Sequence, residues 1–261
     1  MVANVWANCN RQRPVDFRLV VIENGEAVGA WTRHGLQADA VLTSGQSAAA
    51  AKNEGLTWIR AHGGGAFATF DDDDYYGPGY LEEALAALEN GERVVGKSAV
   101  FVLTQTGRLR AVLGWPENAR TDCLVHGPTI CGVVEDAVDF PLVAVGEDTE
   151  WVLAMRRRGF PVWSTSHFRF CYRRAADVVH TLVTEDDALL RCWQRGGGRA
   201  YDYGEWDAEV VDGVLEVVPA EINLGAYQLS DNPGACAAAD ALGWTVDDMA
   251  ACPVTRLGDS R

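Results

Sequence analysis

Basic side chains are scarce in this sequence of 261 residues. It holds 22 Lys and Arg against 37 Asp and Glu, which gives a formal net charge of −15. Proteins that bind nucleic acid without sequence preference need a basic face, and membrane-surface anchors need clusters of Lys and Arg. The charge balance therefore argues against bulk nucleic-acid binding and against a polybasic membrane anchor.

Long apolar runs are also missing, although 48% of the residues are hydrophobic. No apolar run reaches the roughly 18 residues of a membrane-spanning helix, and the N-terminus lacks the charged-then-apolar pattern of a signal peptide. The seven cysteines are scattered, without a CxxC pair, which favours reduced and mostly structural thiols. We therefore expect a cytoplasmic protein that has a sizeable core and no membrane partner.

Segments typical of strands and helices alternate over roughly the first 165 residues. Helical patterns occupy residues 46–61, 80–90 and 147–158. Strand patterns occupy residues 2–8, 17–22, 66–70, 99–103, 109–113 and 160–165. Alternation of this kind predicts an α/β fold with a largely parallel sheet.

The composition of the sequence changes near residue 200, beyond which acidic residues strongly outnumber basic ones. We expect residues 1–200 to form one domain and residues 201–261 to form an acidic C-terminal extension. A hairpin that turns at Asp212-Gly213 and short helices near 234–242 and 245–251 would make up the extension. Such an appendage is a candidate either for covering a substrate site or for self-association into a homo-oligomer.

The most unusual local feature is AFATFDDDDYYGPGYLEE, residues 66–83, in which an apolar strand runs directly into four aspartates. Adjacent carboxylates repel one another, and a hard cation such as Mg²⁺, Mn²⁺ or Ca²⁺ is the simplest group that would stabilise them. The alternative is a solvated acidic loop placed before a helix, where the helix dipole favours negative charge.

Two motif matches near the aspartates fail on local context. An EF-type calcium loop would have Tyr76 at its fifth position, a poor ligand, and would follow a helix instead of a strand. The string GERVVGKS, residues 91–98, fits the phosphate-loop consensus, but that loop follows a strand and opens a helix. Here a helix precedes the string and a strand follows it, so Lys97 is expected on the surface or at a strand edge.

A strand that ends in Asp-x-Asp is typical of a site for a divalent metal and a nucleoside diphosphate. In open α/β sheets, ligands bind beyond the carboxyl ends of the strands. One carboxylate can hold the metal while another binds the ribose hydroxyls, and the metal neutralises the diphosphate as it leaves.

Three stretches resemble the inverting glycosyltransferases of family 2, which have the GT-A fold. The stretch AAAAKNEGLTWIRAHGGGAFATFDDDDYYGPGYLEEAL resembles the nucleotide-sugar half of that family. The stretch HGPTICGVVEDAVDFPLVAVGEDTEWVLAMRRRGFPVW resembles its acceptor-side region, and FRFCYRRAADVVHT more weakly resembles its closing strand and diphosphate loop. The resemblance covers residues 2–185 and implies a Rossmann-like, mixed but mostly parallel sheet flanked by helices.

The resemblance implies roles for each aspartate. Asp73 would be a metal ligand, for Mn²⁺ or Mg²⁺, and Asp71 would contact the ribose or nucleobase side. Asp74 would assist the sugar or the metal, and Asp72 occupies the variable position of the nucleotide-sugar site. Glu23 stands where the family usually has an aspartate for the base or ribose, which leaves the base open, with uridine the commonest.

Other contacts to the nucleotide-sugar are implied at Lys52 and Asn53 on the helix and at Arg173 and Arg174 near the diphosphate. The third metal or diphosphate ligand in such enzymes is often a histidine that follows the acidic helix. His180 and His167 are both candidates for this role in the present sequence, and His180 is preferred because of its place in the closing loop.

Asp148 is expected to be the general base that deprotonates the acceptor hydroxyl, with Glu147 in support. Without the resemblance, Asp148 would be interpreted as a helix N-cap. His126 would lie near the acceptor. Three tryptophans are candidates for stacking on a sugar ring, although such residues are more often part of a core: Trp115, Trp151 and Trp163.

The sequence therefore predicts a metal-dependent, hexosyltransferase-like inverting glycosyltransferase. Its donor would be a nucleotide-sugar, most simply a UDP-sugar, and its acceptor would be a hydroxyl on a protein, small molecule, polymer or modified nucleic acid. Two alternatives stay open: a sugar-nucleotide-binding protein with weak catalysis, and a metal-dependent nucleotidyltransferase, which also places aspartates at a strand end.

Overall fold

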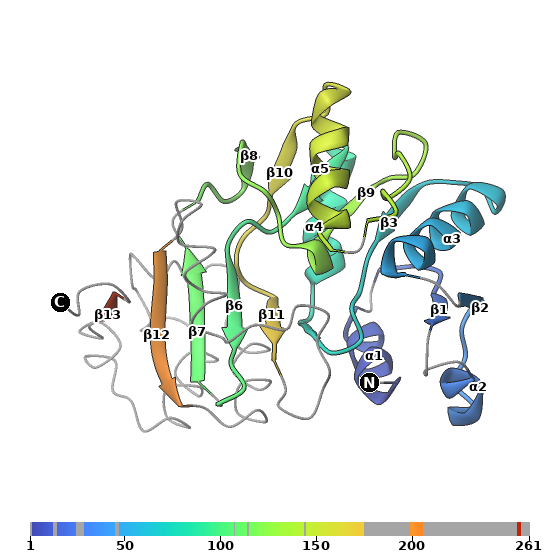
Figure 1. The fold of residues 1–261 in the computed structure, drawn as a ribbon, viewed down its shortest axis with the longest axis horizontal. Helices are drawn as coiled ribbons and strands as arrows, with labels where there is room; N and C mark the ends of the chain where they lie inside the picture. Colours follow the sequence, from blue (N-terminus) through green and yellow to red (C-terminus); the bar gives the residue numbers. More distant parts are fainter. Residues whose placement is uncertain are drawn as a thin grey trace. The chain divides into compact units, whose positions relative to one another are not determined.

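The computed structural model describes residues 2–12, 15–24, 29–44, 47–106, 108–113, 115–143, 145–174, 199–205 and 255–256. They divide into two compact units (Figure 1). The first unit comprises the described residues up to Asp74, Gly79–Ser98 and Pro116–Thr165. The second unit comprises Tyr75–Pro78, Ala99–Trp115 and the described residues from Ser166 onward.

The first unit contains every α-helix in the described part of the chain. These are α1 (Val2–Arg11), α2 (Ala30–His34), α3 (Ala48–Ala61), α4 (Tyr80–Glu89) and α5 (Glu147–Arg157), with a short 3₁₀ helix, η2, at Gly127–Thr129. Its strands are β1 (Val20–Asn24), β2 (Ala40–Ser44), β3 (Ala66–Ala68), β5 (Val94–Gly96), β8 (Ala119–Thr121), β9 (Cys131–Val133) and β10 (Val162–Ser164).

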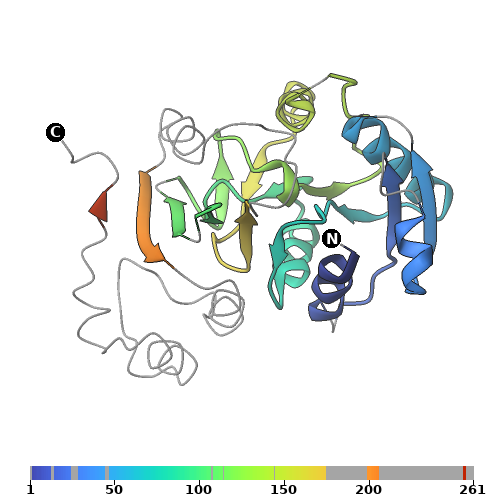
Figure 2. The ribbon, with the colours of Figure 1, turned by 60° about the horizontal axis from the view of Figure 1, so that its bottom comes forward.

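Two sheets organise the first unit. Strands β1 and β2 pair in parallel, with Val20 opposite Ala40 and Asn24 opposite Ser44, and α3 packs against both (Figure 2). The other sheet has the order β3-β9-β5-β10-β8. In it, only β5 and β10 run parallel, and the remaining neighbours are antiparallel.

The second unit is built on one sheet of six strands with the order β13-β12-β7-β6-β11-β4. Its members are β4 (Tyr75–Tyr76), β6 (Val100–Leu103), β7 (Arg108–Leu113), β11 (Phe170–Arg173), β12 (Arg199–Glu205) and β13 (Thr255–Arg256). Strands β6 and β11 are parallel, whereas every other neighbouring pair is antiparallel. Buried side chains of this unit, including Tyr75, Phe101 and Cys171, form its own core.

The core of the first unit centres on Trp151 of α5. Its ring stacks on Phe140 at a centroid distance of 5.1 Å and meets Phe67 of β3 edge-on at 6.0 Å. Val94, Val162 and Met155 complete the same cluster of buried side chains. Trp151 is therefore a core residue and not an exposed sugar platform, whereas Trp115 and Trp163 are half-buried.

Local chemistry explains where the three long helices begin and end. Ser47 caps α3 by accepting the Ala50 amide at 3.4 Å, and an alanine run of high helix propensity follows. Gly79, at φ 75°, immediately precedes α4. Gly146 precedes α5 in the same left-handed conformation, which glycine adopts without a steric penalty. Acidic residues open α5 and arginines close it, as the helix dipole favours.

The α/β class and the helices expected at 46–61, 80–90 and 147–158 are confirmed, and strands β3, β6, β7 and β10 lie where strand patterns occur. The strand expected at 17–22 begins only at Val20. The free thiols of the four described cysteines agree with the expected reduced state. None of the described helices is both long and apolar enough to cross a membrane.

Two expectations about the fold are wrong. Residues 2–8 belong to helix α1 and not to a strand, and Val2, Val5 and Cys9 recur there at helical spacing. The sheets are mixed and mainly antiparallel, not largely parallel. The reason is that short strands such as β9 insert between others and reverse the local direction, which alternation along the sequence does not reveal.

The predicted boundary between residues 1–200 and 201–261 stays a prediction. The hairpin at Asp212-Gly213 and the two short helices beyond it lie outside the described residues.

Candidate active site

Three of the four consecutive aspartates bring their carboxylates together at the end of β3. Oxygens of Asp71, Asp73 and Asp74 all lie within 4.8 Å of one another, whereas Asp72 is exposed. Asp74 is fully buried, and Asp71 and Asp73 are half-buried. Hard carboxylate oxygens at this spacing suit a divalent cation such as Mg²⁺ or Mn²⁺. The group can thus hold a metal ion.

Electrostatics around Asp71 support this interpretation of the cluster. Burial raises the pKa of Asp71 to about 7, Lys52 opposes the rise, and the charges of Asp148, Asp73 and Asp72 add to it. Burial is the largest cause of this rise, because it disfavours the ionised carboxylate. A bound cation would favour the ionised form, so the donor set is compatible with a metal.

Helix α1 holds the backbone of the aspartate run. Asn4 donates from Nδ2 to the carbonyl oxygens of Asp72 at 3.0 Å and Asp74 at 2.8 Å. Asn8 donates to the same Asp74 oxygen at 2.8 Å. These bonds occupy backbone carbonyls and leave the carboxylates to face one another. Sequence reasoning missed both asparagines because the segment was expected to form a strand.

Lys52 pairs with the acidic start of α5, and its charge also influences the aspartate cluster. Its Nζ lies 2.5 Å from Asp148 Oδ1 and 3.2 Å from Glu147 Oε1. Burial lowers the pKa of Lys52, but the charges of Asp148, Asp71 and Glu147 outweigh burial, so that the pKa is raised overall. Lys52 therefore stays charged. Two predicted site residues, Glu147 and Asp148, thus contact this ammonium group, and a third, Asp71, interacts with it electrostatically.

Asp148, at the start of α5, has a carboxyl whose pKa departs from its usual value. Burial raises its pKa, Lys52 opposes the rise, and Glu147 adds to it. Gly127 of η2 lies directly beneath it, because a Cβ built on that glycine would come 2.0 Å from Asp148 Oδ2. Only a residue without a side chain fits between η2 and this carboxylate. The sequence HGPTICG alone does not predict the contact between Gly127 and Asp148.

The loop that carries Gly127 is tied to the strand that delivers the aspartates. Thr69 donates from Oγ1 to the carbonyl oxygens of Ile130 at 3.0 Å and Gly127 at 3.3 Å. Its amide also donates to Ile130 at 2.9 Å. Thr69 stands two residues before Asp71, so its hydrogen bonds connect the start of the aspartate run to the turn that contacts Asp148.

His126 precedes Gly127 and is the histidine nearest to Asp148 in this loop. Burial lowers its pKa to about 4, which keeps the imidazole neutral at physiological pH. Its backbone amide donates to the Lys97 carbonyl at 2.8 Å. The expected place of His126 near an acceptor stays a prediction.

Two predicted nucleotide-sugar residues are engaged with backbone groups. Glu23, buried at the end of β1, accepts from the amides of Gly29 at 2.6 Å and Trp31 at 2.5 Å. Asn53 bridges to Phe140, donating to its carbonyl at 2.8 Å and accepting from its amide at 2.6 Å. Both side chains hold local structure, and their roles toward a donor stay predictions.

The remaining predicted residues fall in the second unit or outside the described residues. Arg173, Arg174 and His167 lie in the second unit, where Arg174 and His167 are buried. His167 packs against Phe168, with ring centroids 4.0 Å apart. Among the described residues, the group suited to a metal contains no histidine. His180 lies outside the described residues.

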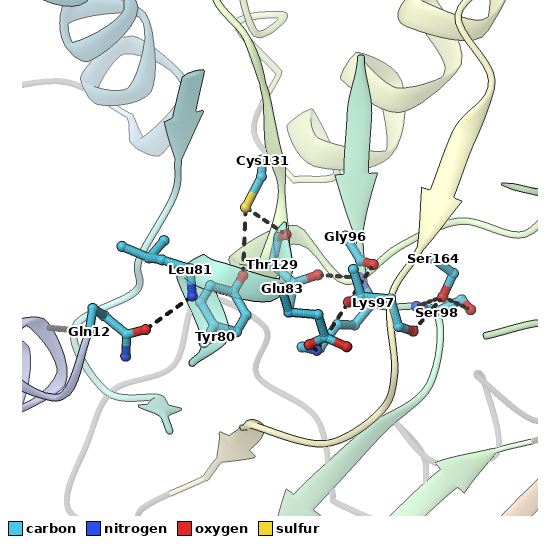
Figure 3. Close-up of polar contacts among 11 residues, drawn as sticks. Gln12, Tyr80, Leu81, Glu83, Gly96, Lys97, Ser98, Thr129, Cys131 and Ser164 are labelled. Carbon is cyan, nitrogen blue, oxygen red and sulfur yellow. Dashed lines mark hydrogen bonds and ion pairs between the residues drawn. The ribbon is translucent and has the colours of Figure 1, made fainter. Parts of the chain in front are cut away.

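The expectation that Lys97 is a surface or strand-edge lysine is wrong. Its side chain is 1% exposed, and its Nζ lies 2.9 Å from Glu83 Oε2 and 3.0 Å from Thr165 Oγ1 (Figure 3). The rejection of a phosphate loop on grounds of order agrees with the fold, since helix α4 precedes the string GERVVGKS and β6 follows it. The rejection of an EF loop agrees likewise, because strand β3 precedes the aspartates.

Comparison with known proteins adds no relative. No protein-family model matches the chain, and no curated protein matches it at a significant level. Function has to be inferred from the chemistry of the site itself.

Proposed function

We propose that this protein is a metal-dependent, inverting glycosyltransferase of GT-A type that uses a nucleotide-sugar, most simply a UDP-sugar. One observation carries the proposal: Lys52 pairs with one set of carboxylates that the reaction needs, and its charge lowers the pKa of Asp71 in the other. The paired set is Glu147 and Asp148 at the start of α5. The other set is the cluster of Asp71, Asp73 and Asp74, suited to a divalent cation.

Asp73, with Asp71 and Asp74, would hold Mn²⁺ or Mg²⁺. When bound, that ion supplies Lewis-acid neutralisation of the diphosphate leaving group. Asp71 contributes a second carboxylate for the ribose side of the donor. Lys52 keeps the metal-binding and base carboxylates from repelling one another, since its ammonium pairs with Asp148 and lowers the pKa of Asp71.

Asp148 acts as the general base in this proposal. The acceptor oxygen forms a bond to the anomeric carbon while the bond from that carbon to the diphosphate oxygen breaks on the opposite face. The hydroxyl proton passes to Asp148, and the nucleoside diphosphate leaves, with inversion at the anomeric carbon. A buried carboxylate with a raised pKa is a better proton acceptor than a solvated one.

Thermal unfolding tests the metal assignment. UDP and Mn²⁺ together should raise the melting temperature of the wild type, and Asp73→Ala should abolish that rise. Asp139→Asn, which changes an exposed carboxylate of the same unit, serves as the control and should keep it. A rise that persists in Asp73→Ala would remove Asp73 as a ligand.

Turnover tests the base assignment. Asp148→Asn should bind UDP with Mn²⁺ as the wild type does and should lose transfer, by about 100-fold or more. Retained transfer would remove Asp148 as the base. Release of pyrophosphate instead of UDP would identify a nucleotidyltransferase, and binding without turnover would identify a sugar-nucleotide-binding protein.

A further inference from the structure

Lys97 is a buried cation next to the candidate active site that the proposed reaction does not use. Its ammonium pairs with Glu83 at 2.9 Å, and the side chain is 1% exposed, so it is almost completely shielded from solvent. It also hydrogen-bonds to Thr165 and lies 5.4 Å from the centroid of the Tyr80 ring (Figure 3). Glu83 and Tyr80 stand one turn apart on α4, so Lys97 contacts two residues of the first turn of this helix.

The first turn of α4 packs against the residue that precedes the aspartate run. Tyr80 packs edge-on against Phe70, the residue immediately before Asp71, at a centroid distance of 5.5 Å. Burial raises the pKa of the Tyr80 phenol well above its usual value, and the nearby charges of Glu83 and Asp74 contribute to the rise. Tyr80 therefore packs against the residue that precedes the metal-binding carboxylates.

The backbone of Lys97 holds the other half of the site. Its carbonyl accepts the His126 amide at 2.8 Å, and its amide donates to Thr129 Oγ1 at 2.9 Å. Thr129 Oγ1 in turn donates to the His126 carbonyl at 2.7 Å. These bonds close the turn that contains Gly127, on which Asp148 rests.

Stability alone gives little reason to bury this charge. A buried ion pair loses about as much hydration energy as it gains in attraction, and apolar residues of similar size often replace such a pair without loss of stability. The specific contribution of the ammonium is directional, since it joins Glu83 of α4 to Thr165, the residue that follows β10. The bond to the η2 turn comes from the backbone amide of the same residue.

We propose that Lys97 is a positioning residue, which through its side chain and backbone sets the aspartate cluster and the Gly127 turn beneath Asp148 at a fixed spacing. This inference rests on the proposed function, because it assigns the aspartate cluster to a metal. Loss of the ion pair should loosen the metal ligands without unfolding the unit.

The double variant Lys97→Met/Glu83→Met tests this role. Metal-free protein is titrated with Mn²⁺, and free Mn²⁺ is read by electron paramagnetic resonance to give the Kd, without nucleotide or acceptor. The melting temperature is measured in parallel in chelator. We expect a Kd about tenfold weaker than that of the wild type, at the lower end of the effect of residues that orient metal ligands, with a melting temperature close to that of the wild type.

The control is Arg120→Met/Glu92→Met, which removes another pair of the first unit, 3.0 Å apart with Glu92 8% exposed on its side chain, and should leave the Kd unchanged. The milder variant Glu83→Gln keeps the shape of the pair and should weaken Mn²⁺ binding by about twofold. A Kd within error of the wild type in both Glu83 variants, or a Kd that only follows the melting temperature, would overturn the positioning role. Absence of Mn²⁺ binding by the wild type would instead overturn the metal site and, with it, this inference.

Discussion

Lys52 Nζ and Asp148 Oδ1 lie 2.5 Å apart, although 96 residues separate them in the sequence. The same ammonium lowers the pKa of Asp71, the first residue of the aspartate cluster. One lysine therefore balances the charge of two carboxylate groups with different proposed tasks, metal binding and proton abstraction. Changes at Lys52 should affect both.

Replacement of Lys52 by Met should destabilise the protein in a pH-dependent way. Asp71, Glu147 and Asp148 would then repel one another without a cation, at a cost of about 1–2 kcal/mol at pH 7 for a pair that is still partly solvated. The deficit should shrink at pH 5, because protonation of the carboxyls relieves the repulsion. Urea denaturation at both pH values measures it.

The surface pair of Arg60 and Asp139 is the control for that experiment. Arg60→Met removes a comparable cation whose side chain is 36% exposed, and it should change the free energy of unfolding by about 0.5 kcal/mol or less. A Lys52→Met variant as stable as the wild type at pH 7, or one with the same deficit at both pH values, would contradict the central charge assigned to Lys52.

Substitution of Gly127 by Ala should disable transfer while donor binding survives. The new Cβ would stand 2.0 Å from Asp148 Oδ2, and either the carboxylate or the η2 turn has to move. A displaced base costs about 100-fold in transfer rate. Isothermal titration with UDP and Mn²⁺ should give a Kd near that of the wild type.

Gly55→Ala controls for the general effect of adding a methyl group. Its Cβ would meet only the end of the flexible Ile22 side chain, so activity should be retained. Full activity in Gly127→Ala would show that the close contact with Asp148 has no role in the reaction.

Acidification should destabilise the protein in part through His126. The folded-state pKa of this imidazole is about 4, below its unfolded value of 6.5. The contribution of His126 to the free energy of unfolding is complete above pH 6.5 and is lost as the pH falls toward 4. The reason is that the unfolded chain binds a proton at this imidazole in that range, whereas the folded chain does not. Between pH 7 and pH 5 the loss should be about 1–2 kcal/mol.

The comparison of wild type with His126→Gln isolates this term from other titrating groups. Chemical denaturation at pH 7, 6 and 5 should show a smaller decline for the variant. Equal declines in the two proteins would mean that His126 titrates normally in the fold.

Helix α1 should contribute to metal affinity through Asn8. Asn8→Ala removes a fully buried hydrogen bond to the Asp74 carbonyl, which should cost about 1 kcal/mol in stability and weaken Mn²⁺ binding about threefold. Asn10→Ala on the same helix is the control, because Asn10 lines a separate cavity of about 370 Å³ with Trp6 and Phe17. Equal Mn²⁺ affinity in both variants would remove α1 from the site.

Sequence patterns were informative where structure is local. The alanine run after Ser47, the periodic leucines behind Gly79 and the acid-to-arginine polarity of α5 each specify a helix within one segment. The aspartates at the end of β3 were likewise identified as a candidate metal site from adjacent residues alone.

Long-range pairings could not be predicted from local patterns. Lys97 is buried by Glu83 and Thr165, the latter 68 residues away, so nothing next to Lys97 indicates its burial. The direction of β9 between β3 and β5 depends on tertiary pairing and not on strand propensity. The contact of Gly127 with Asp148 arises in the same way, from segments that only the fold brings together.

Nucleotide release from a panel of donors tests the proposed function most directly. Wild type and Asp73→Ala are incubated with UDP-, GDP- and dTDP-sugars, with Mn²⁺ or with chelator, and the free nucleoside diphosphate is measured. We expect the wild type to release a nucleoside diphosphate, UDP most simply, only with Mn²⁺, and Asp73→Ala to release none. Folded wild-type protein that releases no nucleoside diphosphate from any donor, or releases it equally in chelator, would contradict a metal-dependent glycosyltransferase.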